Sequence, residues 1–176
     1  MKTKIELVKG SVIDQDVDVI VNAANARLRG GGGIDGLIHR MAGPRLLNYL
    51  VEYHPDPLNP GEVAISPGFD LPQAIIHAPG PIWKDGENGE KEHLVTLYES
   101  ILDCANCVGA KKIAFCSIST GIYGYPLDDA CDLAISTIIR WLESNDHEIE
   151  TIVFAMYGDT EHNVYENALK NKLNNI

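Results

Sequence analysis

The chain has 176 residues, of which 45% are hydrophobic and 22% charged, values that suit one globular domain with a complete core. Its formal net charge of −11 excludes a protein that holds nucleic acid or an anionic membrane through a broad basic surface. A phosphate-binding site in this chain must therefore rely mainly on backbone N–H groups and on helix N-termini. We expect residues 1–176 to form a single domain.

The N-terminal segment "MKTKIELVKG" alternates charged and apolar residues, so it does not have the apolar centre of a secretory signal. The apolar runs elsewhere are too short to span a membrane. We therefore expect a cytoplasmic protein that does not contact membranes.

The four cysteines fit that compartment, and we expect them to be reduced and mostly buried. Cys104 and Cys107 form a C-x-x-C pair within a predicted helix. No second such pair and no paired histidines complete a zinc site, so we expect no metal.

Short apolar segments alternate with longer amphipathic ones along the chain. The apolar segments predict strands at residues 5–8, 17–23, 62–66, 74–78, 112–117 and 151–156. The amphipathic segments predict helices over 36–53, interrupted at Gly43-Pro44, and over 91–108, 126–144 and about 161–173. Because several strands are apolar throughout, this order predicts an α/β protein whose central sheet is mixed, largely parallel and covered on both sides.

The ends of two predicted helices carry specific signals. Gly109 follows helix 91–108 as a terminating residue, and Pro126 opens the next helix. One face of helix 91–108 is apolar, and we expect it to be buried; it contains Leu94, Leu97, Ile101, Cys104 and Val108.

The first informative loop follows the strand at 17–23, in the segment "VNAANARLRGGGGIDGLIHRMAGP". Gly30 to Gly33 offer consecutive N–H groups without side chains and lead into a helix N-terminus, an arrangement that suits a diphosphate. The alternative is a flexible turn, although four glycines cost conformational entropy that a turn does not require.

The second loop, "SISTGIYGYP" over 117–126, lies between a strand and a helix. Gly121 and Gly124 leave the backbone accessible, while Tyr123 and Tyr125 offer flat faces for a sugar or base. The alternative is a hydrogen-bonded loop with core tyrosines, which suits Tyr125 beside Pro126. Ligands of parallel sheets bind at the C-terminal ends of strands, so the two loops suit a diphosphate flanked by two ribosides.

Two common nucleotide motifs fit poorly. "GGGIDG" over 31–36 matches the glycine pattern of dinucleotide-binding folds, but eight residues separate Ala23 from Gly32, where that motif needs a tight turn. The acid expected about twenty residues further on would fall in the proline-rich segment 54–61 instead of at a strand end. No Gly-Lys-Ser/Thr follows the glycines, as a P-loop requires. An NAD-dependent oxidoreductase is therefore the weakest of the functions considered.

Four segments in order, "VNAAN", "GGGGIDG", "IHRMAGP" and "STGIYGYP", resemble the macro domain family. The resemblance is to its MacroD-type branch, the bacterial O-acetyl-ADP-ribose deacetylases and mono-ADP-ribosyl hydrolases, and extends from "IELVKGS" to "VYENAL". It implies a three-layer α/β/α fold that binds ADP-ribose and needs no metal or cofactor. Its expected partners are ADP-ribosylated proteins or O-acetyl-ADP-ribose, and we expect a monomer.

The resemblance also implies the contacts of the ligand. Asn25 would hold the distal ribose, and the Tyr123 ring would lie against that sugar. Tyr157 would stack on the adenine, although the loop that carries it varies within the family. The two sides of the diphosphate would be lined by Gly32, Gly33 and Ile34 and by Ser119, Gly121, Ile122 and Tyr123.

Asp35 is the residue that the resemblance assigns to catalysis, with Asn25 as the positioning residue. A carboxylate beside the glycines can reach the distal ribose and accept a proton from water or engage a ribose hydroxyl. From the residues alone, Asp35 is an acid favoured by the helix dipole in a first turn. His39 lies one turn further, and we interpret it as structural.

The family usually has Gly-Asp-Ile after the first strand, with the aspartate accepting a hydrogen bond from the adenine amino group. Here the positions are Gly10, Ser11 and Val12. By the resemblance, Ser11 and Val12 contact the base, with a hydroxyl in place of a carboxylate.

The leading hypothesis is a hydrolase that removes mono-ADP-ribose from acidic side chains and deacetylates O-acetyl-ADP-ribose. The alternative is a module that binds ADP-ribose without turnover. Asp35 within "GGGGIDG" favours the enzyme.

Overall fold

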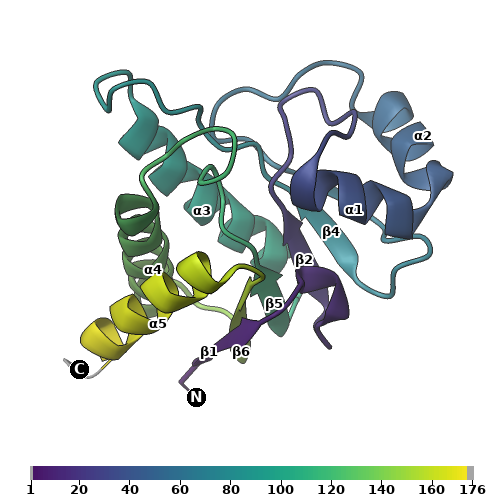
Figure 1. The fold of residues 1–176 in the computed structure, drawn as a ribbon. Helices are drawn as coiled ribbons and strands as arrows, with labels where there is room; N and C mark the ends of the chain where they lie inside the picture. The colour runs from purple at the N-terminus through teal and green to yellow at the C-terminus, as the bar shows by residue number, and fades with distance from the viewer. Residues whose placement is uncertain (1, 174–176) are drawn as a thin grey trace.

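The computed structural model describes residues 2–173 and contains one six-stranded sheet (Figure 1). Its strands are β1 (Lys4–Lys9), β2 (Val19–Asn22), β3 (Ala64–Ser66), β4 (Ala74–His77), β5 (Lys112–Phe115) and β6 (Thr151–Met156). Their order across the sheet is β1-β6-β5-β2-β4-β3. Neighbouring strands are parallel except for β3 and β4, which are antiparallel, so the predicted mixed, largely parallel sheet is confirmed.

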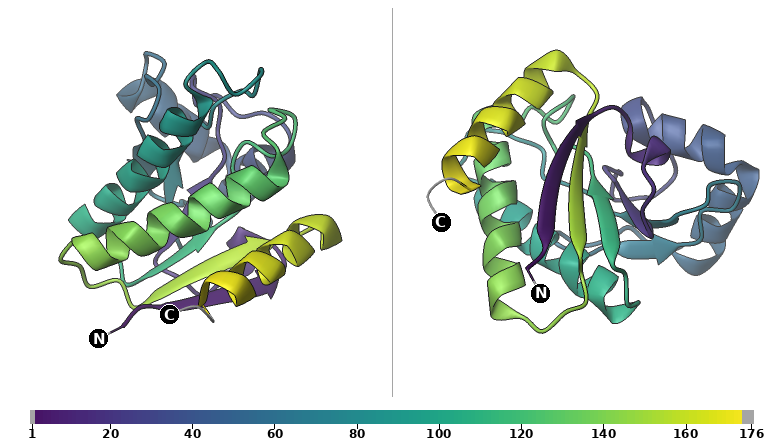
Figure 2. Two further views of the ribbon diagram at one scale, coloured as in Figure 1. Left: turned by 90° about the vertical axis from the view of Figure 1, so that its left-hand side faces the viewer. Right: turned by 90° about the horizontal axis from the view of Figure 1, so that it is seen from below.

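Helices cover the sheet on both faces (Figure 2). They are α1 (Gly33–Ala42), α2 (Pro44–Tyr53), α3 (Glu90–Cys107), α4 (Leu127–Ser144) and α5 (Asp159–Leu173), with a short 3-10 turn, η1 (Val12–Asp14). Core residues of α3, α4 and α5 cluster on one face, and those of α1, α2 and η1 cluster on the other. The result is the three-layer α/β/α arrangement expected from the sequence.

The alternation of side chains along each strand produces these two cores. In β2, Val19 and Val21 belong to the cluster under α3 and α4, whereas Ile20 belongs to the cluster under α1 and α2. All three are buried, because a strand inside a three-layer fold is covered on both faces. This explains why the strands are apolar throughout.

Three details of the sequence prediction differ from the structure. Val108 does not share the buried face of α3: the helix ends at Cys107, and Val108 is its C-cap, with its side chain 53% exposed. Gly109 follows with a φ of 72°, which turns the chain away from the helix as predicted. The cysteines are free, and Cys116 and Cys131 are buried, but Cys107 is exposed.

The first helix also starts earlier than predicted, at Gly33 instead of Gly36. Asp35 lies in the first turn, as predicted. Within residues 2–173, no helix is long and apolar enough to cross a membrane, and no cluster of three or more metal-ligating side chains is found.

Candidate functional site

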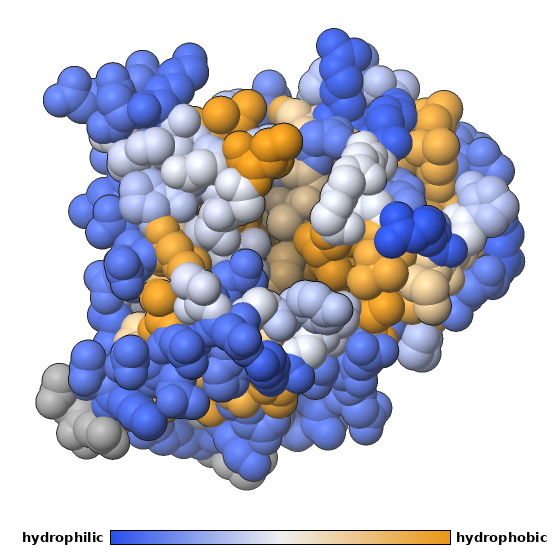
Figure 3. Space-filling view, in the orientation of Figure 1, coloured by the Kyte–Doolittle hydropathy of each residue, from blue (hydrophilic) through white to orange (hydrophobic). Residues whose placement is uncertain are grey.

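Two adjoining cavities lie beside the loops that follow β2 and β5, and they have volumes of about 220 and 540 Å³. They share Gly33, Ile34, Ser117 and Gly121, so together they form one groove. In the space-filling view, a hollow with apolar residues around it opens near the centre of this face (Figure 3). The groove thus lies at the C-terminal ends of parallel strands, as expected for this class of fold.

All twelve residues predicted for the site line one of these cavities. The smaller is lined by Asn25, Gly32, Gly33, Ile34, Asp35, Ser119, Gly121, Ile122 and Tyr123. The larger is lined by Ser11, Val12 and Tyr157, together with the shared Gly33, Ile34 and Gly121. The structure therefore brings them together, whereas their contacts with a ligand stay predictions.

The glycines of the first loop have distinct local roles. Gly30 and Gly33 have φ values of 85° and 58°, a region that side chains disfavour. Gly36 has an ordinary φ, but a Cβ there would lie 2.4 Å from the carbonyl oxygen of Gly31. The loop therefore packs directly on the first turn of α1.

Because of this packing, the N-terminus of α1 lies at the groove. The N–H groups of Gly33, Ile34 and Asp35 belong to the first turn and have no carbonyl partner within the helix. Together with the positive end of the helix dipole, they form a site that favours an anion.

The second loop is fixed by its own backbone bonds. Gly124 N–H donates to the Gly121 carbonyl at 3.0 Å, and Tyr125 N–H donates to the Ser119 carbonyl at 2.9 Å. Ser119 has a φ of 67°, unusual for a residue other than glycine. The two tyrosines of this loop have different positions. Tyr125 is buried against Trp83, as expected for a core tyrosine, whereas Tyr123 lines the groove.

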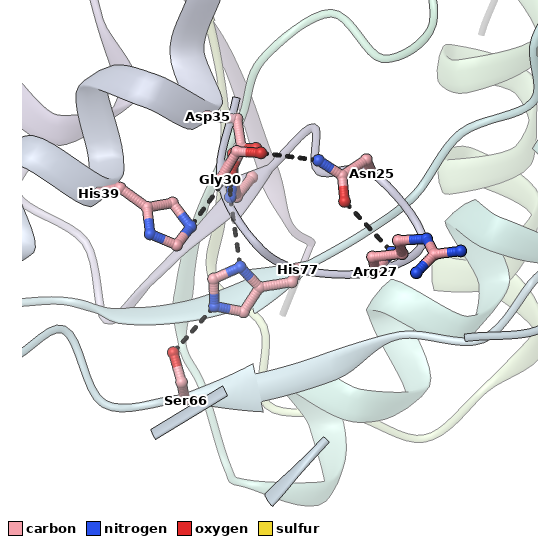
Figure 4. A network of polar contacts seen from close by, with 8 residues as sticks. Asn25, Arg27, Gly30, Asp35, His39, Ser66 and His77 are labelled. Atoms are coloured by element: carbon pink, nitrogen blue, oxygen red, sulfur yellow. Dashed lines mark hydrogen bonds and ion pairs between the residues drawn. The ribbon is translucent and has the colours of Figure 1, made fainter. Parts of the chain in front are cut away.

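The side chain of Asn25 braces the first loop. Its Nδ2 donates to the Gly30 carbonyl at 2.8 Å, and its Oδ1 accepts from the Arg27 N–H at 3.1 Å (Figure 4). A replacement at this position therefore changes the loop as well as the wall of the groove.

Asp35 is nearly buried, with 5% of its surface exposed. Its Oδ1 accepts a hydrogen bond from Asn22 Nδ2 at 2.7 Å and lies 3.5 Å from His39 Nε2. Its Oδ2 faces the glycine loop, 3.5 Å from where a Cβ on Gly31 would stand. Burial raises the pKa of Asp35, and the Asn22 hydrogen bond and the charge of His39 only partly oppose that shift.

The structure adds residues that the sequence analysis missed. Asn22, His77 and Ser66 form a buried polar chain that ends at Asp35 (Figure 4). Burial, followed by the charges of His39 and His54, lowers the pKa of His77 to about 3. A usable signal was present in the sequence, because Asn22 and His77 are polar residues inside strands predicted to be buried on both faces.

The far end of the groove carries the residues predicted to meet the base. Ser11 is the N-cap of η1, and its Oγ accepts from the Ile13 N–H at 3.4 Å. Val12 is buried and lines the larger cavity. Tyr157 follows β6 directly, and its side chain is 80% exposed. Ile122 in the second loop is fully exposed.

The fold and the groove define a ligand-binding α/β/α domain, and comparison with known proteins places it in a family. A family model for the macro domain matches residues 21–134. This chain belongs to the macro domain family.

Its similarity to individual proteins extends over nearly the whole chain. It is 42% identical to an O-acetyl-ADP-ribose deacetylase of Enterobacter sp. (strain 638), covering 96% of this chain and 95% of that one. The Oceanobacillus iheyensis macrodomain with ADP is 38% identical, with a TM-score of 0.90 over 98% of this chain and 93% of that one. The Trypanosoma brucei macrodomain in complex with ADP-ribose is 37% identical, with a TM-score of 0.86 over 94% of this chain and 68% of that one.

Proposed function

We propose that the protein binds ADP-ribose and hydrolyses its esters, removing mono-ADP-ribose from acidic side chains and deacetylating O-acetyl-ADP-ribose. The observation that carries the proposal is the position of Asp35. Its carboxylate is nearly buried at the inner end of the groove, its pKa is raised, and one of its oxygens faces the glycine loop. Buried ionisable groups in a cleft with shifted pKa values are typical of catalytic sites.

The shape of the groove supports ADP-ribose as the ligand. Two cavities meet at the start of α1 and at Gly121, which suits a ligand with two ends joined by a diphosphate. Backbone N–H groups at this junction bind phosphate oxygens without cationic side chains. The solved structures of two relatives contain ADP and ADP-ribose, which agrees with this assignment.

Hydrolysis in this arrangement requires a water aimed at the ester or the anomeric carbon. Asp35 accepts the proton of that water or holds a ribose hydroxyl, Asn25 positions the distal ribose, and the Tyr123 ring lies against it. The adenine lies at Ser11, Val12 and Tyr157. When water attacks the anomeric carbon of ADP-ribosyl-glutamate, the glutamate carboxylate leaves, so serine-linked ADP-ribose, an acetal with a poorer leaving group, is the worse substrate. In O-acetyl-ADP-ribose, water attacks the acetyl carbonyl instead, and the ribose hydroxyl and acetate are released.

The same proposal includes a monomeric, cytoplasmic protein whose partners are ADP-ribosylated proteins. The free state of its four cysteines supports a reducing compartment.

Ligand choice tests the proposal. ADP-ribose should bind much more tightly than AMP, which reaches only the larger cavity, and than NAD, whose nicotinamide occupies the anomeric position. Calorimetric titration of all three measures this order, and equal affinities would contradict the groove as assigned. Turnover of ADP-ribosyl-glutamate and O-acetyl-ADP-ribose then separates an enzyme from a binding module, because only the enzyme releases product.

A further inference from the structure

In the buried chain of hydrogen bonds behind Asp35, the donor and acceptor of each bond can be assigned by starting from Ser66. Ser66 Oγ lies 3.1 Å from the Pro67 carbonyl oxygen and 2.9 Å from His77 Nε2. A carbonyl oxygen can only accept a hydrogen bond, so the Ser66 hydroxyl donates its single proton to it. Ser66 Oγ is then the acceptor for His77, and Nε2 must be the protonated nitrogen of that ring.

The tautomer of His77 in turn orients the amide of Asn22. In a neutral imidazole protonated at Nε2, Nδ1 is an acceptor and needs a donor. Asn22 Nδ2 lies 3.2 Å from His77 Nδ1 and 2.7 Å from Asp35 Oδ1. Its two N–H groups therefore serve the histidine and the carboxylate, one each.

The opposite orientation of the Asn22 amide is unfavourable both at Asp35 and at Ser66. If the Asn22 amide were turned over, its oxygen would stand 2.7 Å from a carboxylate oxygen, a repulsive contact unless Asp35 were protonated. His77 would then need its proton on Nδ1, and the Ser66 hydroxyl would have to leave the Pro67 carbonyl to donate to Nε2. The observed orientation does leave Asn22 Oδ1 without a hydrogen bond to any residue in 2–173, a smaller cost than the repulsion.

We propose that Ser66 and His77 are positioning residues that act through Asn22 to hold the Asp35 carboxylate with Oδ2 towards the ligand. The inference rests on the proposed hydrolytic role of Asp35. It adds that a hydroxyl on β3 and an imidazole on β4, neither of which touches the ligand groove, set the geometry of the reacting group. Both are buried, with exposed fractions of 2% for Ser66 and 0% for His77.

The hydrogen-bonded chain behind Asp35 gives its two carboxylate oxygens different roles. Oδ1 is held by Asn22 from the interior, with His39 beside it, whereas Oδ2 faces Gly31 and the groove. A carboxylate held by one oxygen cannot rotate freely, so its other oxygen keeps a fixed position for water or a ribose hydroxyl. Such positioning matters for rate because displacements of about 1 Å can cost roughly 100-fold.

The tautomer can be measured without any turnover. In protein labelled with ¹⁵N-histidine, NMR at neutral pH should show His77 neutral, with the proton on Nε2 and none on Nδ1. His39 and His54 lie near His77, so the spectrum is recorded at several pH values to identify each ring. A His77 protonated on Nδ1, or on both nitrogens, would overturn the direction of the chain.

The functional consequence is tested with Ser66→Ala, which removes the last acceptor of the chain. Without it, His77 can move its proton to Nδ1 and turn the Asn22 amide over. We expect kcat to fall roughly 10- to 100-fold, the effect of losing a hydrogen bond to a charged group. The affinity for ADP-ribose should stay within about two-fold of wild type, because Ser66 does not line the groove.

The pH profile gives a readout that a general loss of stability would not change. The hydrogen bond from Asn22 favours the ionised form and lowers the pKa of Asp35, so its loss raises that pKa. In Ser66→Ala, the acid limb of kcat/KM should therefore move to higher pH. An unshifted limb together with unchanged kcat would refute the positioning role.

Two variants serve as controls. Ser66→Thr keeps the hydroxyl that accepts from His77, so activity should return. Thr137→Ala removes a buried hydroxyl from α4 that lines neither cavity, and should leave kcat unchanged despite any loss of stability.

The outcomes also separate this inference from the proposed function. If Asp35→Ala abolishes turnover while Ser66→Ala does not change it, only the positioning role fails. If Asp35→Ala keeps full activity, the catalytic assignment itself fails. The NMR result decides the tautomer in either case, including for a protein that binds ADP-ribose without turnover.

Discussion

The burial of Asp35 is more than helix stabilisation requires, and it supports the catalytic role that we propose. An acid in the first turn of a helix gains from the dipole while its carboxylate stays in water. Asp35 instead has only 5% of its surface exposed, and burial raises its pKa because the charged form loses hydration. A side chain that only stabilised the helix would not need this costly position, whereas a general base benefits from a raised pKa.

Replacing Asp35 should therefore affect turnover more than binding. We expect Asp35→Ala to reduce turnover of ADP-ribosyl-glutamate by roughly 10²–10⁴-fold, the range for a general base. ADP-ribose affinity should change little, or improve as a negative charge leaves the groove. Asn25→Ala should lower both, because Asn25 also braces the Gly30 carbonyl of the loop. Steady-state kinetics and calorimetry on the two variants measure turnover and affinity. Full activity in Asp35→Ala would mean that Asp35 only stabilises the helix.

Ser11 should change the choice of base. Its Oγ accepts from the Ile13 N–H, so its own proton is available to an acceptor on the ligand. The hypoxanthine analogue of ADP-ribose has a carbonyl oxygen where adenine has an amino group, and this protein should tolerate it. Ser11→Asp should tighten ADP-ribose about five-fold, since a charge-assisted bond is stronger by about 1 kcal/mol, and should weaken the analogue.

Titration of both ligands into both proteins tests this, with Ser11→Asn as a control that matches aspartate in shape without its charge. An unchanged ratio of affinities would mean that Ser11 does not touch the base.

At the scale of elements, the sequence predicted most of what local patterns encode. Apolar runs located the six strands, and Gly109 marked the end of α3, because these signals depend on residues close in sequence. The early start of α1 at Gly33 was missed, since glycines are poor helix formers and the turn is stabilised by packing of the loop on Gly36. Val108 was placed wrongly because the end of a helix is less certain than its periodicity.

The residues of the candidate site also fall into those that the sequence could predict and those that it could not. Its glycines and Asp35 are contiguous in sequence, so a motif could identify them. Ser66, His77 and Asn22 come from three strands, and their contact depends on the register of β4 against β2 and of β3 against β4. No pattern within one segment predicts that register, which is why the chain behind Asp35 appears only in the structure.

The close contact at Gly36 gives a prediction for the glycine loop. In Gly36→Ala, the new Cβ would lie 2.4 Å from the Gly31 carbonyl oxygen, so the loop must move away from α1. We expect a loss of about 1–3 kcal/mol in the free energy of unfolding and weaker ADP-ribose binding. Gly32→Ala is the stability control, because a Cβ there meets nothing within 4 Å and its φ of −96° suits any residue. Denaturant titrations that showed equal stability for both variants would contradict this packing.

At the scale of the whole molecule, the ligand that we propose is an anion and the protein itself is acidic. The net charge is −11, and within residues 2–173 Arg40 is the one basic residue that lines either cavity. Attraction must then come from backbone N–H groups and the dipole of α1, which act over a short range. The other charges of the molecule repel the ligand over a longer range, and salt screens that repulsion.

This division of forces predicts an unusual salt dependence. A site built from lysine and arginine loses affinity for a diphosphate as salt is added, because the attraction is screened. Here the screened interaction is repulsive, so the affinity for ADP-ribose should increase as the salt concentration rises from ~0.01 M to ~0.15 M. The gain should be on the order of 1 kcal/mol, or about five-fold in Kd. Calorimetry in a chloride series measures it, with Arg40→Gln as the matched variant, which should keep the same upward trend. A steady fall in affinity that disappears in Arg40→Gln would show instead that a cation on α1 binds the phosphates, and the backbone account of the groove would be wrong.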